Sequence, residues 1–232
     1  MSSGSRRVQW LLLGIAAAVL LAGAAAARIS SSAAVVPLKL AVGASATLSV
    51  FRVLPDTVRL SLDFDRRDGL QRPELGESRS TSGPGYLEFA SPGEPIVIRV
   101  RGPSSTADFE ALPASGSGAN RVHRHLVIRT ADGDPRRFPW PPDNSARPAL
   151  PVGTSTITIE VLEVGAPLAG EKVAAVFKAP LSFKEYMPGY GFLWWFLLWP
   201  AWAAPLVACA AFLAYRSRDS WRVWRAPPQR NP

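Results

Sequence analysis

Two long stretches of this sequence carry no charged side chain, one close to each end of the chain. The first runs from Val8 to Ala27 and the second from about Gly191 to Tyr215. At 1.5 Å per residue, the 20 residues of the first stretch form a helix about 30 Å long, which is the thickness of a bilayer's hydrocarbon core. We therefore expect a membrane-anchored protein, divided into residues 1–7, 8–27, 28–188, 189–215 and 216–232.

The first apolar stretch has two interpretations. A retained transmembrane helix explains its length, because the apolar part of a secretory signal usually spans only about 7–15 residues. A removable signal explains the basic start at Arg6 and Arg7 and the Ala25-x-Ala27 sequence, which is like a cleavage site. A twin-arginine signal is a third, weaker interpretation. We favour retention, and each interpretation places residues 28–188 outside the cytoplasm.

The second apolar stretch ends in an arginine-rich tail, which is typical of a stop-transfer segment. Trp195, Trp199 and Trp202 follow an i, i+4, i+7 spacing, which places them on one face of a continuous helix. That face either binds a partner membrane protein or contacts lipid and the first helix. Pro200 and Pro205 are expected to kink the helix. We expect contacts at the membrane interfaces, with arginine on anionic lipid, from Tyr190, Trp194, Trp221, Arg222, Trp224 and Arg225.

The net charge of +8 is a topology signal rather than a nucleic-acid signal. Residues 28–188 hold 19 Lys and Arg against 17 Asp and Glu, so 6 of the 8 excess charges lie in the two tails. Positive charge beside an apolar stretch marks the cytoplasmic side. The only cysteine, Cys209, lies in the second apolar stretch, which favours a disulfide-free domain in a bacterial periplasm, anchored in the inner membrane.

Residues 28–188 repeatedly alternate apolar and polar side chains, which predicts β-strands. The clearest strands are expected at residues 57–64, 96–101 and 156–161, with further ones at 38–42, 46–54, 86–90, 107–111, 121–129, 173–178 and 181–184. The pattern resembles immunoglobulin-like and fibronectin-like domains, which implies an antiparallel β-sandwich flanked by transmembrane helices. Residues 153–177 are expected to form a long hairpin closing over residues 165–170.

Two long loops, at residues 65–85 and 130–152, separate the expected strands. The second contains Phe138 and Trp140 within a proline-rich segment. A stiff segment of this kind loses little entropy on docking, so both aromatic residues are candidates for binding a partner. Alternatively, they fold back and cap an open end of the sandwich.

Motifs that would carry chemistry are weak. His123-x-His125 places two imidazoles on one face of a strand, but neighbouring arginines argue against a metal. Residues 165–172 imitate a phosphate-binding loop without its Gly-Lys-Ser/Thr ending, and a hairpin turn explains them better. Asp63, Asp65 and Asp68 lack the closing Glu of a calcium loop. We predict no catalytic residue, no metal site and no cofactor.

The sequence thus favours a non-enzymatic accessory or scaffold subunit of a bacterial inner-membrane complex. Its β domain and its tryptophan-rich helix would bind a membrane or periplasmic protein. A periplasmic ligand- or metal-handling module is the second hypothesis, and a membrane-tethered envelope hydrolase is the third.

Overall fold

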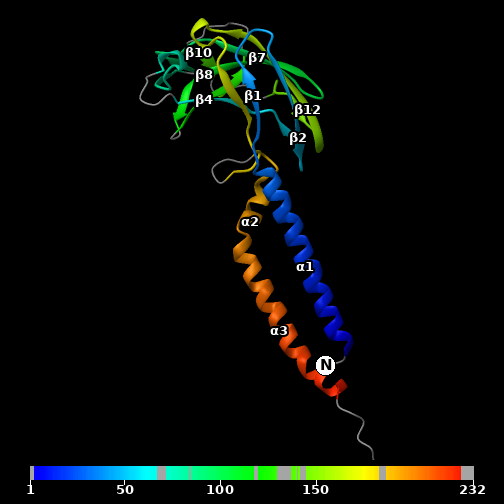
Figure 1. Ribbon diagram of the computed structural model, residues 1–232. Helices are drawn as coiled ribbons and strands as arrows, with labels where there is room; N and C mark the ends of the chain where they lie inside the picture. Colours follow the sequence, from blue (N-terminus) through cyan, green and yellow to red (C-terminus); the bar gives the residue numbers. More distant parts are fainter. Residues whose placement is uncertain are drawn as a thin grey trace, which may run out of the picture. The chain divides into compact units, whose positions relative to one another are not determined.

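The computed structural model describes residues 3–66, 72–83, 85–117, 120–129, 137–139, 141, 145–182 and 187–225. The chain divides into two compact units (Figure 1). The helical unit consists of Met1–Arg28 and Leu181–Pro232, and the β unit consists of Ile29–Pro180.

One antiparallel sheet of eight strands forms most of the β unit. Its strand order is β1 (Ala34–Lys39), β13 (Lys172–Phe177), β4 (Leu60–Asp65), β9 (Arg121–Ile128), β8 (Thr106–Ser117), β7 (Ile96–Arg101), β12 (Gly153–Val164) and β2 (Ser45–Arg52). The sheet curls until its edge strands β1 and β2 approach each other, so it forms a nearly closed barrel (Figure 1).

Two small antiparallel ladders accompany the barrel. One joins β10 (Arg137–Pro139), β6 (Tyr86–Phe89) and β5 (Ser80–Gly83), and the other joins β11 (Ala149–Leu150) to β3 (Asp56–Thr57). Single 3-10 turns lie at Pro73–Leu75, Ala166–Leu168 and Gly191–Leu193.

The apolar side chains at alternate positions of the strands face the main core. Leu62 and Phe64 of β4 and Ile157 and Ile159 of β12 are at most 1% exposed and belong to the main core. The opposite face of β8 and β9 is partly covered by a second apolar cluster of Phe89, Val127 and Phe138, against which Leu87 and Leu112 pack. The core therefore fills the barrel, and the three-stranded ladder lies on its outer surface.

The expected two-sheet sandwich is not what these strands form. All eight main strands are hydrogen-bonded in one series, so they form a single sheet that curls into a nearly closed barrel instead of splitting into two layers. The expected hairpin over residues 153–177 is also wrong, because β12 pairs with β2 and β7 while β13 pairs with β1 and β4. Alternation specifies the buried face of a strand but not its neighbours, which explains both errors.

The helical unit contains α1 (Ser3–Ser30), α2 (Trp194–Leu197) and α3 (Trp199–Arg225). Over Arg7–Ser30, α1 is long and apolar enough to cross a membrane. Among the described residues, Gly191–Leu197 and Trp199–Ser217 form a second segment of that kind only if they are taken together, across a bend of 60°. Pro200 falls in the first turn of α3, where the missing N–H is tolerated, whereas Pro205 lies inside the helix.

Candidate interaction surfaces

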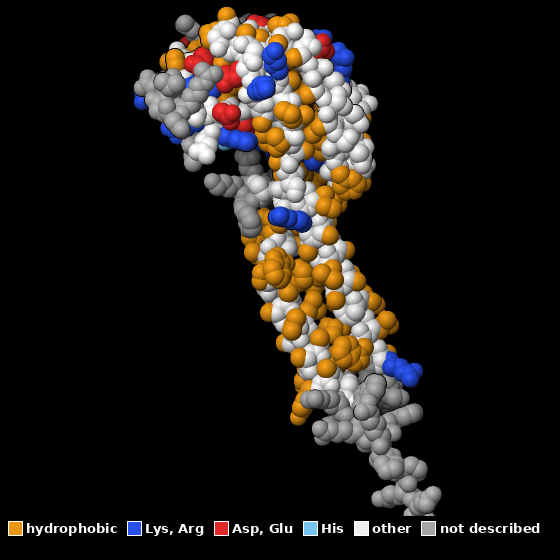
Figure 2. Space-filling model, viewed as in Figure 1, with side chains coloured by type: hydrophobic (Ala, Val, Ile, Leu, Met, Phe, Trp, Pro, Cys, Tyr) orange, Lys and Arg blue, Asp and Glu red, His pale blue; other side chains and the backbone are white. Residues whose placement is uncertain are grey.

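An apolar groove separates α1 from α3 within the helical unit. It has a volume of about 400 Å³, and its lining residues are Trp10, Leu13, Gly14, Ala17 and Leu21 of α1 with Trp202, Ala203, Leu206, Val207 and Ala210 of α3. Apolar side chains dominate the visible face of both helices (Figure 2).

Two glycines of α1 differ sharply in what surrounds them. At Gly23, a Cβ atom would lie 2.2 Å from the ring of Phe196, so this glycine provides the space into which Phe196 packs. At Gly14, a Cβ atom would meet no atom within 4 Å, although the residue lines the groove. The missing side chain of Gly14 therefore leaves space in the groove that no described residue of the chain fills.

The three tryptophans expected on one helix face are separated by the bend. Trp195 belongs to α2, whereas Trp199 and Trp202 belong to α3. The 60° bend between the two helices means that the three indoles do not share one face, as they would in a continuous helix. Trp195 is 69% exposed and Trp199 is 59% exposed, whereas Trp202 is partly buried and lines the groove. Two of the three indoles are thus free for an external contact.

The residues expected at the membrane interfaces differ in how deeply their side chains are buried. Tyr190 is fully buried, so its ring is not available to lipid headgroups. Trp194 is partly buried and makes an edge contact with Trp195, with the ring centroids 5.9 Å apart. Trp221, Arg222, Trp224 and Arg225 belong to the last turns of α3, and their side chains lie outside the described part of the structure.

Phe138 packs inside the protein rather than facing a partner. Its side chain is 6% exposed, and its ring meets the edge of Phe89 at a centroid distance of 5.6 Å. Phe138 thus belongs to the apolar cluster on the outer surface of the barrel rather than to a cap over an open end. Trp140, the second aromatic residue of that loop, lies outside the described residues.

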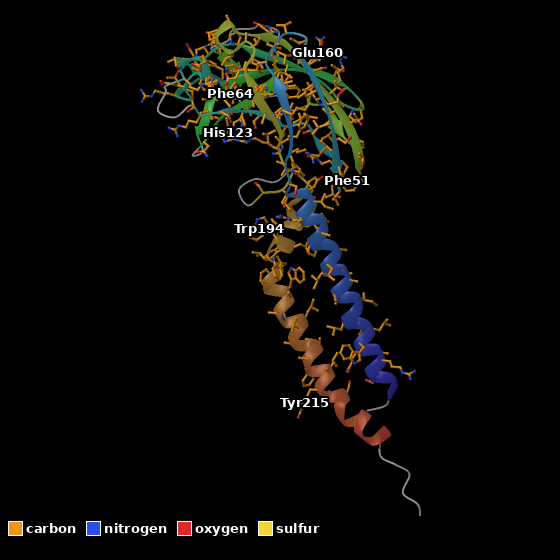
Figure 3. All side chains as sticks on the ribbon, in the orientation of Figure 1. Phe51, Phe64, His123, Glu160, Trp194 and Tyr215 are labelled. Carbon is orange, nitrogen blue, oxygen red and sulfur yellow. The ribbon has the colours of Figure 1, made fainter. Side chains whose placement is uncertain are left out.

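The two histidines of β9 lie on the outer face of the sheet, opposite β4. His123 pairs with Asp63 in the ladder, and its Nδ1 lies 2.6 Å from Asp63 Oδ1. Arg121 Nη1 lies 3.6 Å from the other carboxylate oxygen of Asp63. Among the described residues, no group of three or more His, Cys, Asp or Glu side chains could hold a metal ion. Asp63 therefore neutralises local positive charge and orients His123, whose side chain is labelled in Figure 3.

Paired charges cover the outer face of β7, β8 and β12. Arg99 Nε lies 2.8 Å from Asp108 Oδ1, and Arg101 Nη2 lies 2.7 Å from Glu160 Oε2. Next to them, partial burial raises the pKa of Glu110, an effect that the positive charge of Arg129 opposes. Alternating signs on neighbouring strands make this face a set of cross-strand ion pairs.

Arg124 is a buried residue that the sequence did not single out. It is 1% exposed and donates hydrogen bonds to the backbone carbonyls of Ala111, Leu112, Pro92 and Glu94 at 2.8 to 3.4 Å. Burial lowers its pKa to about 10. Ala111 and Leu112 lie at a register shift of β8, so Arg124 satisfies carbonyls near the irregular part of the ladder. The sequence feature that could have identified this residue is an arginine at a core-facing position of a strand.

Comparisons with known proteins assign no family. No family profile matches the chain, and no curated protein matches it. A solved structure of a protein from Sulfurospirillum deleyianum is similar over 63% of this chain and 97% of that chain, with 16% sequence identity and a TM-score of 0.39. This similarity is too low to support an inference about fold or function.

Proposed function

We propose that this chain is an accessory or scaffold subunit of a bacterial inner-membrane complex and that its helical unit binds a helix of a partner membrane protein. The observation that carries the proposal is the groove between α1 and α3, with its open space at Gly14. Between transmembrane helices, small residues allow close backbone approach, and association depends on packing. A groove whose apolar lining includes Gly14 and three alanines therefore suits a third helix.

The membrane topology belongs to the same proposal. Both α1 and the α2–α3 segment would cross the inner membrane, with Arg7 and Arg216 on the cytoplasmic side and the β unit in the periplasm. The contact between Gly23 and Phe196 supports retention of α1, because its removal would leave Phe196 without this packing surface. Exposed Trp195 and Trp199 would extend the binding surface.

Photo-crosslinking in living cells tests the proposal. A benzophenone amino acid placed at Val207, which lines the groove and is 68% exposed, or at Trp199 should crosslink to one and the same membrane protein, identified by mass spectrometry. Leu11 is the control position, because it is 64% exposed but does not line the groove. If only lipid adducts form at Val207 and Trp199, or if Leu11 gives the same protein with equal yield, the proposal is wrong.

The metal-handling alternative rests on the short Asp63–His123 contact, because histidines that ligate a metal commonly have a carboxylate on the other ring nitrogen. It predicts metal in the purified full chain, lost when His123 and His125 are both changed to Ala. A carboxylate already shared with Arg121 fits that role less well.

A further inference from the structure

The chain enters and leaves the β unit at one end of the barrel. β1 begins at Ala34, four residues after α1 ends at Ser30. Ala34 pairs with Phe177, the last residue of β13, and the β unit ends at Pro180. Four residues of extended chain span at most about 14 Å. The connection between α1 and this end of the barrel is therefore short.

Three segments form this end of the barrel. Lys178 N–H donates to Arg59 O at 3.0 Å, and β11 pairs with β3, which ends just before the start of β4. The first residue of β12 pairs with the last residue of β2 at the same end. We call this end the connecting rim, and it consists of residues 51–59, 147–153 and 176–180.

The connecting rim carries an excess of positive charge. Its only acid is Asp56, whose carboxylate is bound within the chain, because Arg52 Nε lies 3.0 Å from Asp56 Oδ2 and both side chains are buried. The rim also contains Arg59, Arg147 and Lys178. Four cations against one acid give these described residues a net charge of +3.

Arg147 is a partly buried cation of the rim without an acidic neighbour. Burial and the positive charge of Arg59 both lower its pKa, and no described carboxylate opposes these effects. Its Nε atom is buried and has no hydrogen-bond partner among the described residues. Arg59 is held in place by a 2.9 Å hydrogen bond from its Nη2 to Ala179 O. A bound anion would stabilise these two guanidinium groups, and arginine binds phosphate oxygens through paired N–H donors.

Exposed apolar side chains accompany the cations of the rim. Phe51, near the end of β2, is 49% exposed (Figure 3), and Val152, just before β12, is 59% exposed. Both lie at the end of the ladder between β2 and β12, in which Thr154 pairs with Phe51. Basic side chains together with exposed apolar ones are typical of surfaces that bind the membrane interface.

We propose that the connecting rim binds the headgroups of anionic phospholipids. This inference rests on the topology in the proposed function, in which the short connection after α1 keeps the rim within reach of the bilayer surface. Arg59 and Arg147 would bind a lipid phosphate, and Phe51 and Val152 would enter the interfacial region. The exposed apolar side chains and the short connection favour lipid over a soluble phosphate.

Fluorescence quenching by spin-labelled lipid tests the inference on the full chain in nanodiscs. A fluorophore is attached to one introduced cysteine at a time, after Cys209→Ser removes the only native cysteine. Val152, Val42 and Val19 are matched positions, because all three are valines that are 59% to 69% exposed. Val42 follows β1, at the end of the barrel away from the rim, and Val19 belongs to α1.

The lipid composition is the first variable. Nanodiscs of phosphatidylcholine are compared with nanodiscs that also contain the anionic lipid phosphatidylglycerol. A quencher on the lipid headgroup should quench the probe at Val152 more when phosphatidylglycerol is present, and it should leave the probe at Val42 unaffected. Equal quenching at the two positions, or quenching at Val152 that does not depend on phosphatidylglycerol, would overturn the inference.

Substitutions of Arg147 are the second variable. In phosphatidylglycerol, Arg147→Gln should lower the ratio of quenched to unquenched probe at Val152 about fivefold, because one arginine near the anionic surface is lost. Arg147→Lys keeps the charge and should lose less. Arg121→Gln is the control, because Arg121 is an exposed arginine at the start of β9, outside the rim. An equal loss in Arg147→Lys and Arg147→Gln, or in Arg121→Gln, contradicts the inference, as does no loss in Arg147→Gln.

Two further results separate this inference from its rivals. A benzophenone amino acid at Val152 should give lipid adducts in living cells, and a protein adduct in high yield would mean that the rim binds a partner protein instead. A quencher in the lipid acyl chain should quench the probe at Val19. Without that quenching, α1 does not cross the bilayer and the proposed function fails, whereas quenching at Val19 without quenching at Val152 is a failure of this inference alone.

Discussion

Arg124 shows how a single charged residue can stabilise an apolar barrel. Its guanidinium group donates to four backbone carbonyls and has no carboxylate within hydrogen-bond distance among its described contacts. Two of the acceptors, Pro92 and Glu94, flank Gly93, whose φ of +73° takes the chain through a tight approach to Gly76. Arg124 therefore links β8, β9 and the segment before β7.

Replacing Arg124 should be strongly destabilising. In Arg124→Met, the buried carbonyls of Ala111, Leu112 and Glu94 would lose their donor, and each unsatisfied group costs about 1–3 kcal/mol. We expect the free energy of unfolding to fall by about 3 kcal/mol or more, measured by urea titration of the full chain in detergent with far-ultraviolet circular dichroism. Arg121→Met is the control, because the Arg121 side chain is 53% exposed. Equal losses in both variants would contradict this account of Arg124.

Glu110 should make stability depend on pH. Burial raises the pKa of its carboxyl group in the folded state, so ionisation of Glu110 opposes folding. The contribution of the protonated Glu110 carboxyl group to the free energy of unfolding is fully present below its pKa in the unfolded chain, about 4.5. This contribution is lost as the pH rises through the higher pKa of the folded chain. Glu110→Gln should therefore be more stable than the wild type at pH 7, and the difference should vanish below about pH 4.5. A difference that stays constant from pH 7 to pH 4 would contradict this assignment.

At the scale of elements, α1 has two kinds of small residue with opposite roles. Gly23 gives its space to Phe196 within the chain, while Gly14 faces an unfilled groove. The bend between α2 and α3 accompanies this packing and separates Trp195 from the longer helix. Sequence periodicity alone could not distinguish these glycines, because both occupy equally apolar surroundings along α1.

Leucine at the two positions should have different effects. Gly23→Leu would place side-chain atoms where the Phe196 ring lies, and overpacking of this kind costs about 1–3 kcal/mol. Gly14→Leu meets no atom near its Cβ and gains helix propensity, so it should be neutral or slightly stabilising. Unfolding of the full chain by sodium dodecyl sulfate, followed by circular dichroism, measures both. Equal destabilisation by the two variants would contradict the packing described for α1.

The first helix should remain on the mature protein. The Ala25-x-Ala27 sequence lies inside α1, which continues to Ser30, and Ala27 is fully buried. In the folded chain, a protease could reach this bond only after the helix unwinds. Intact-mass analysis of the chain purified from membranes should therefore retain residues 8–27. A mass corresponding to a mature start at Arg28 would show that the stretch is a removable signal.

At the scale of the whole molecule, the sequence predicted the positions of the main strands better than it predicted how the strands pair. The strands expected at residues 96–101 and 121–129 are β7 and β9 within one residue. The strand expected at residues 107–111 extends through two register shifts to Ser117, and the expected loops contain β5, β10 and β11. Irregular pairing and short ladders depend on tertiary contacts, which no local pattern encodes.

The interaction surfaces were predictable only in part. Exposed Trp195 and Trp199 follow from an aromatic-rich apolar segment, but the space at Gly14 and the connecting rim depend on which elements become neighbours. Phe138 is a second example. Its sequence context suits partner binding as well as packing within the domain, and only the folded chain shows that it packs on Phe89.

Quantitative affinity purification from native membranes in a mild detergent tests the central claim most directly. The full chain, its Gly14→Leu variant and its Ala16→Leu variant should be compared, since Ala16 is exposed on α1 but does not line the groove. The account predicts one membrane protein recovered in near-equimolar amount with the full chain and with Ala16→Leu, and about tenfold less with Gly14→Leu. Recovery of the chain alone, or of the same partner in equal amount with Gly14→Leu, would contradict it.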